Sequence, residues 1–148
     1  MAEALFNTMG DGVYRAYSAG SAALGIVNRF ALQEIKSTHY PINKLRSKGL
    51  HEYSRPDAPK IDFLIILDDS FADKALPKWL DGAIKARWQI DHTTQSDGTF
   101  DEKKEAFKNT FSQIQNKIDL FTQLPLAHLD QKQLDIEMKK WNSNYVPV

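Results

Sequence analysis

Two pairs of polar residues can do acid–base or metal chemistry, and each pair directly follows a predicted strand. Asp68-Asp69 comes after the apolar run 61–67, and Asp91-His92 comes after residues 86–90. Neighbouring carboxylates can hold a magnesium ion, and an aspartate or a histidine can protonate a leaving oxygen. The carboxyl ends of strands are where α/β sheets place ligand sites. Solvated loop residues beyond a buried strand are the commoner role for such pairs, so both interpretations stay open.

No cysteine is present in the sequence to act as a nucleophile. This excludes a thiolate, disulfides, cysteine-ligated zinc and iron–sulfur clusters in these 148 residues. The sequence also has no Gly-x-Gly-x-x-Gly motif, no Walker-type phosphate loop and no His-Glu-x-x-His motif, and its four histidines show no metal-ligand spacing. A small basic cluster, Leu45–Lys48, can touch an anion. We therefore expect no cofactor and no metal.

The composition is that of a globular chain without nucleic-acid or membrane partners. A length of 148 residues suits one domain with a real core. Its 19 basic residues balance its 19 acidic residues, so the chain offers no electrostatic footprint for nucleic acid or an anionic membrane. It contains no run of about 18 apolar residues, and its first residues do not resemble a signal peptide. We expect a cytoplasmic protein.

Hydrophobic periodicity and helix breakers predict alternating helices and strands around these candidates. Helices are expected at 1–9, at 27–37, from a cap at Thr99 or Asp101 to Pro125, and at 129–141, with a helical turn at 49–53. Strands are expected at 13–19, 61–67 and 86–90. The nearly unbroken apolar run 61–67 is typical of a parallel strand buried on both faces. This order predicts an α/β sandwich.

Many short stretches, in order along the chain, resemble one protein family. They are 1–7, 16–21, 27–32, 45–48, 56–59, Asp62-Phe63, Arg87-Trp88, Ala106-Phe107, 118–121, 124–126 and Leu129-Asp130. Together they resemble the low-molecular-weight protein tyrosine phosphatase superfamily. The branch that they resemble most is the thioredoxin-coupled type of bacterial arsenate reductase.

The resemblance implies a phosphotyrosine phosphatase I-like sandwich, with a four-stranded parallel sheet covered by helices. In the family, a first strand leads into a loop of Cys, five residues and Arg-Ser, which cradles an oxyanion at the start of the first helix. The Cys thiolate attacks phosphorus or arsenic. Residues 1–4 resemble the stretch directly after that Arg-Ser. The first strand, the Cys and the Arg are therefore expected to be missing from this chain.

The resemblance also implies that the later chemistry has been lost or altered. The two cysteines that carry oxidation onward as a disulfide in the reductases fall on Asp68 and Leu76. The Asp-Pro pair that protonates the leaving oxygen falls near His92-Thr93, with Asp91 just before it. The resemblance thus makes Asp91 and His92 a vestigial general-acid loop, and Asp68 and Leu76 degenerate relay positions.

An absent first strand would leave a gap in the sheet, between strand 13–19 and strand 61–67. The gap would be about 9–10 Å wide, whereas neighbouring strands are ~4.8 Å apart. Losing about five buried apolar residues, at ~1.5–3 kcal/mol each, removes roughly as much free energy as a whole domain's net stability. We expect an upstream extension, a rearranged sheet or a second chain to fill the gap.

These expectations leave three hypotheses about function. The resemblance divides the chain into a phosphatase/arsenate reductase-like domain at 1–125 and a C-terminal helix and tail at 126–148. The leading hypothesis is a catalytically inactive member of the family. The first alternative is an active enzyme read from the wrong start codon, in which a restored loop would bind phosphate or arsenate. The second is a non-enzymatic interaction module that completes its sheet in a homodimer.

Overall fold

The computed structural model of this chain describes residues 1–21, 23–67, 76–91 and 98–141. The chain forms two compact units, each built from two segments. The first unit consists of Met1–Arg55 and Asp91–Gln123, and the second of Pro56–Ile90 and Leu124–Val148. The described residues form a mixed α/β fold with four α-helices and a two-stranded parallel sheet. Short 3-10 helices lie at Ile42–Lys44, Leu50–Tyr53, Lys78–Leu80 and Leu126–His128.

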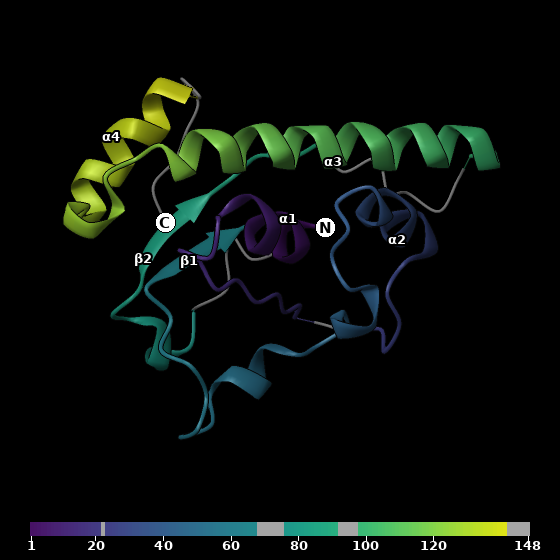
Figure 1. Cartoon of the computed structure of the whole chain (residues 1–148). Helices are drawn as coiled ribbons and strands as arrows, with labels where there is room; N and C mark the ends of the chain where they lie inside the picture. Colours follow the sequence, from purple (N-terminus) through teal and green to yellow (C-terminus); the bar gives the residue numbers. More distant parts are fainter. Residues whose placement is uncertain (22, 68–75, 92–97, 142–148) are drawn as a thin grey trace. The chain divides into compact units, whose positions relative to one another are not determined.

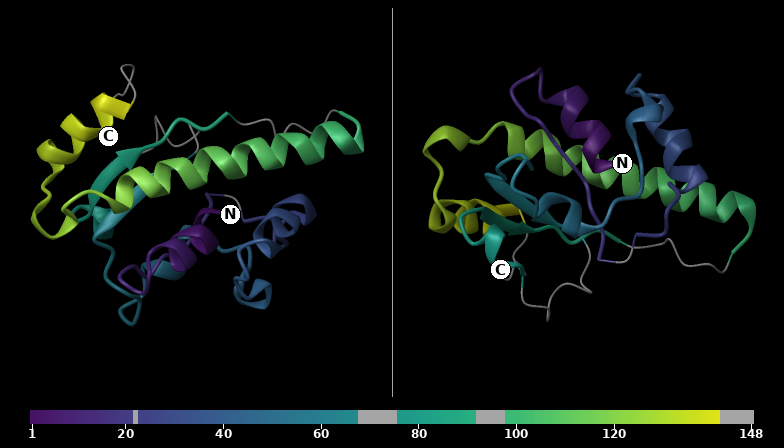
Figure 2. Two further views of the ribbon diagram at one scale, coloured as in Figure 1. Left: turned by 45° about the horizontal axis from the view of Figure 1, so that its top comes forward. Right: turned by 90° about the horizontal axis from the view of Figure 1, so that it is seen from below.

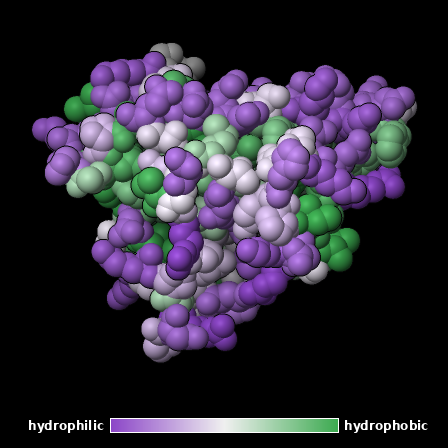
Figure 3. Space-filling model, viewed as in Figure 1, coloured by the Kyte–Doolittle hydropathy of each residue, from purple (hydrophilic) through white to green (hydrophobic). Residues whose placement is uncertain are grey.

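The long helix of the first unit, α3 (Phe100–Thr122), forms because its start signal and its apolar repeat agree. Thr99 and Glu102 make a reciprocal capping box, in which Glu102 Oε2 accepts a hydrogen bond from Thr99 N–H at 2.7 Å. Its buried residues recur at one-, three- and four-residue steps on one side: Phe107, Thr110, Phe111, Ile114, Ile118 and Phe121. Figure 3 shows hydrophilic side chains along the upper edge of the view, where Figure 1 places α3. The helix therefore has one buried stripe.

Two short helices pack against this stripe of α3. Figures 1 and 2 show α1 (Ala2–Met9) and α2 (Arg29–Lys36) on the same side of α3. The rings of Phe6 in α1 and Phe121 meet edge to face, with centroids 5.8 Å apart. Phe30 in α2 stacks on Phe107 with centroids 5.6 Å apart. The predictions of helices at 1–9, 27–37 and from Thr99 onward are confirmed. The apolar faces of the two short helices pack against the buried stripe of α3.

The predicted strand at 13–19 is wrong. Residues 14–19 belong to neither strand nor helix, and Gly20 makes only an isolated parallel bridge with Gly49. The backbone of Ala16 is instead bonded to the side chain of Asn7, with the Ala16 N–H donating at 3.0 Å. A β-prone segment becomes a strand only where a neighbouring strand offers a ladder, and the described residues offer none here.

The second unit contains a short parallel sheet of two strands. β1 (Phe63–Ile66) pairs in register with β2 (Ile84–Arg87), from Phe63 opposite Ile84 to Ile66 opposite Arg87. The prediction of β1 within 61–67 is confirmed. The strand predicted at 86–90 begins two residues earlier and ends at Arg87, because its pairing with β1 starts where Ile84 N–H donates to the Asp62 carbonyl. The expected four-stranded sheet is not confirmed, since the described residues supply two strands.

The burial of β1 differs from its prediction. An apolar run of this kind predicted a strand buried on both faces, but Phe63, Leu64 and Ile65 are half-buried and only Ile66 is fully buried. A parallel strand with so little cover is unusual, because parallel sheets are normally sheltered on both faces by helices.

The last helix, α4 (Gln131–Trp141), lies against β2 within the second unit. Leu134 and Met138 are its buried residues, while Ile136 stays half exposed. The prediction of a helix at 129–141 is confirmed with a start two residues later. Among the described residues, no helix has both the length and the apolar character to cross a membrane.

Candidate functional site

The predicted site residues fall partly within the described chain. Asp68 and His92 lie outside the described residues, as does Asp69. Leu76 is half-buried and precedes Pro77 and a 3-10 helix. An aliphatic side chain at this position has no redox chemistry to offer, whatever its surroundings. Asp91 is therefore the one predicted site residue whose polar contacts can be followed.

Asp91 follows β2 and is bonded to α3 within the first unit. Its N–H donates to Gln113 Oε1 at 3.2 Å, and Gln113 Nε2 donates back to Asp91 Oδ2 at 3.3 Å. Thr110 Oγ1 donates to the Asp91 carbonyl at 3.3 Å. Three hydrogen bonds therefore hold this residue against α3, and its carboxylate accepts one of them.

The charge of this carboxylate affects the pKa of a lysine on the next turn of α3. Partial burial lowers the pKa of Lys117 from its ordinary value, and the negative charge of Asp91 acts in the opposite direction. The exposed Asp91 carboxylate thus has a carboxamide donor and an ammonium group near it. This arrangement suits a carboxylate that accepts hydrogen bonds and fixes residue 91 on α3.

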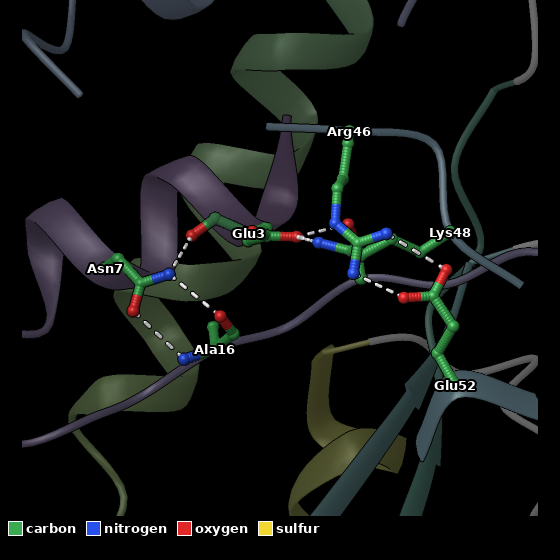
Figure 4. A network of polar contacts seen from close by, with 7 residues as sticks. Glu3, Asn7, Ala16, Arg46, Lys48 and Glu52 are labelled. Atoms are coloured by element: carbon green, nitrogen blue, oxygen red, sulfur yellow. Dashed lines mark hydrogen bonds and ion pairs between the residues drawn. The ribbon is translucent and has the colours of Figure 1, made fainter. Parts of the chain in front are cut away.

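The basic cluster Leu45–Lys48 already has carboxylate partners in the structure. Arg46 forms a bidentate ion pair with Glu52, in which Arg46 Nη1 donates a hydrogen bond to Glu52 Oε1 at 3.2 Å. Hydrogen bonding between the two side chains raises the pKa of Arg46 and lowers the pKa of Glu52. Lys48 pairs with Glu3 (Figure 4). Both cations are therefore already paired with a carboxylate, although the Arg46 side chain is largely exposed.

The Glu3–Lys48 pair is the most buried charged contact that the described residues form. Lys48 Nζ lies 2.8 Å from Glu3 Oε2, and the two side chains are 6% and 7% exposed. Ser18 Oγ donates to the same carboxylate oxygen. The neighbouring Asn7 donates to the Glu3 carbonyl at 2.8 Å and to the Ala16 carbonyl at 2.9 Å (Figure 4). These contacts hold the segment after α1 and the segment around Lys48 against the helix.

One tyrosine, Tyr53, adjoins this buried pair, and a second tyrosine packs against its ring. The rings of Tyr17 and Tyr53 lie with centroids 5.6 Å apart. Burial raises the pKa of Tyr53, while the nearby Lys48 lowers it and Glu3 raises it. We call Glu3, Ser18, Lys48 and Tyr53 the polar cluster. It balances one carboxylate against one ammonium, and such a balance favours a structural role over reaction with a charged substrate.

Sequence reasoning missed the polar cluster. A glutamate directly before the buried Ala4, Leu5 and Phe6 was the available signal, because a carboxylate on an apolar helix face needs a partner. The identity of that partner, 45 residues away, had no local signal. The described residues contain no group of three or more histidine, cysteine, aspartate or glutamate side chains that could hold a metal ion.

Comparison with known proteins identifies no relative of this chain. No protein-family model, no curated protein and no solved structure matches it.

Proposed function

We propose that this chain is a degenerate member of the low-molecular-weight protein tyrosine phosphatase superfamily, nearest to the arsenate reductases, and that these 148 residues are catalytically inactive. One observation carries the proposal. Family-like stretches run from residue 1 to residue 130, yet the sequence holds no cysteine at all. The proposal rests on resemblance for ancestry and on chemistry for inactivity.

Two features of the fold support the ancestry. β1 and β2 run parallel, which requires a crossover connection of the kind that α/β sandwiches use. Asp91 follows β2 after three residues, directly before His92-Thr93, near which the family's Asp-Pro general-acid pair falls.

The inactivity follows from the reaction itself. Both activities of the family need a sulfur that attacks phosphorus or arsenic, and without one the covalent intermediate cannot form. A general acid has no leaving oxygen to protonate when that attack does not occur. An aspartate at 68 and a leucine at 76 cannot form a disulfide, so they cannot carry oxidation onward.

The direct experiment is an assay of arsenate reduction and aryl phosphate hydrolysis on the purified 148-residue protein. We expect turnover no faster than buffer. Asp91→Asn is the matched control, because it preserves the shape of the side chain and removes its acid function. Turnover that resists thiol alkylation and falls in Asp91→Asn would overturn the proposal, since it would show a working site without sulfur.

A second candidate is an active phosphatase or arsenate reductase whose reading frame begins before Met1. The partial exposure of Phe63, Leu64 and Ile65 in β1 favours it, because another parallel strand would bring the sheet closer to the four strands of the family. The test is the coding sequence upstream of Met1. In-frame codons for a β-prone run followed by Cys-x5-Arg-Ser would support this candidate, and a nearby in-frame stop codon would remove it.

The same exposure of β1 also suits an interaction module that completes its sheet with a second copy. Light scattering on the purified protein separates this version from the others. A dimer would support it, whereas a folded monomer that stays monomeric at high concentration would contradict it.

A further inference from the structure

One side chain of α4 is bonded to the backbone of β2 as a neighbouring strand would be. Gln131 Oε1 accepts a hydrogen bond from Lys85 N–H at 2.7 Å, and Gln131 Nε2 donates to the Lys85 carbonyl at 2.7 Å. A carboxamide contains the same donor and acceptor as a peptide group. Gln131 therefore satisfies both backbone groups of one strand residue.

The two groups of Lys85 lie on the edge of β2 that faces away from β1. The N–H groups of Ile84 and Trp88 donate to β1, at 2.8 Å to Asp62 and 2.9 Å to Ile66. Successive residues of a strand direct their backbone groups to opposite sides, so Lys85 and Arg87 present theirs to the outer edge. An outer edge of this kind is a template for another strand, and Gln131 occupies it at Lys85.

Apolar packing of α4 and a further hydrogen bond of the carboxamide both fix the position of Gln131. Leu134 and Met138, one and two turns further along α4, are 0% and 2% exposed. The second hydrogen of the carboxamide is also used, because Gln131 Nε2 donates to Asp135 Oδ1 at 3.0 Å. The hydrogen bond to Asp135 therefore fixes the orientation of the carboxamide toward the strand. Apolar packing holds α4 beside β2.

We infer that α4 is an edge guard: through Gln131 it prevents the outer edge of β2 from pairing with the same edge of a second copy of this chain. A second copy is the relevant partner because it carries an identical edge. Two identical edges pair antiparallel about a twofold axis, which gives a closed dimer. This inference concerns the edge opposite β1, so it is independent of the proposed function and of any strand added beside β1.

The experiment begins with the unaltered protein, by amide hydrogen exchange. Lys85 N–H should exchange at a rate close to those of the ladder amides of Ile84 and Trp88. Arg87 N–H is the internal reference, because it faces the same outer edge and none of the described residues accepts a hydrogen bond from it. Exchange at Lys85 as fast as at Arg87 would overturn the inference without any variant.

Gln131→Met then removes both hydrogen bonds and keeps the length of the side chain. We expect Lys85 N–H to exchange at least tenfold faster in the dilute monomer. We also expect the dissociation constant of the dimer, measured by light scattering, to fall at least tenfold. Lys132→Met is the matched control on the same turn of α4. The Lys132 side chain is exposed and has no hydrogen bond or ion pair with another described residue, so this variant should behave as the unaltered protein.

A proline at the guarded residue tests the geometry of the association. Lys85→Pro removes the edge-facing N–H, and proline is tolerated where a strand N–H faces outward. Adding it to Gln131→Met should abolish the new association. Association that survives the proline, or faster exchange at Lys85 without association, would reduce Gln131 to a helix anchor and refute the guard.

Discussion

At the scale of single residues, the Glu3–Lys48 pair shows that burial determines how much an ion pair matters for stability. Both side chains are less than a tenth exposed, whereas Arg46 in the neighbouring pair with Glu52 is 64% exposed. Exposed ion pairs contribute little to stability. A buried pair behaves differently, because removing one partner leaves the other as an uncompensated charge in a poorly solvated place.

We therefore predict that Lys48→Met lowers the free energy of unfolding by about 3–5 kcal/mol. Chemical denaturation measures the change. Arg46→Met serves as the control and should cost far less, because its partner Glu52 remains in contact with water. The double variant Glu3→Met, Lys48→Met should recover most of the loss, because no charge is then buried alone. Equal costs for Lys48→Met and Arg46→Met would contradict this picture.

At the scale of elements, the start of α3 links helix formation to pH. The pKa of Glu102 lies below its ordinary value of 4.5, mainly because its carboxylate accepts a hydrogen bond from Thr99 N–H and also one from the Thr99 hydroxyl. A depressed carboxyl pKa means that the folded state binds its proton less readily than the unfolded state. The resulting stabilisation is complete above the ordinary value and is lost as the pH falls through the lower, folded value.

Glu102→Gln should accordingly flatten the acid side of the stability profile. Glutamine keeps the oxygen that accepts from Thr99 N–H and does not titrate. Acidification therefore removes less stabilisation from this variant. Denaturation midpoints measured across the acidic range test this. Glu105→Gln lies on the same helix, where its carboxylate meets only Lys108 at 3.9 Å, and it should leave the slope nearly as it was. Parallel slopes for the unaltered protein and Glu102→Gln would refute the assignment.

At the scale of the whole molecule, each unit has its own buried residues. Ile118 in the first unit and Leu134 in the second are both 0% exposed. Truncating a fully buried aliphatic side chain to alanine typically costs about 2–5 kcal/mol. Compact units of this kind often open separately, and hydrogen exchange reports such openings segment by segment.

We predict that Leu134→Ala accelerates amide exchange mainly in 56–90 and 124–141. Ile118→Ala should accelerate it mainly in 1–55 and 91–123. The two variants act as controls for each other, because they remove aliphatic side chains of equal size from equally buried places. Uniform acceleration throughout the chain by either variant would show that the molecule opens only as one body.

The amino-acid sequence by itself determined the helices, the apolar strand β1 and the absence of a thiol. Helix signals act within a few residues, which is why the cap at Thr99 and the apolar stripe of α3 were sufficient to place that helix. Only the tertiary structure decided which distant residues meet. Among the described residues it gave 14–19 no strand partner, and it joined Glu3 to Lys48 and Asp91 to Gln113. Such contacts depend on how the chain folds back on itself, and no local pattern carries that information.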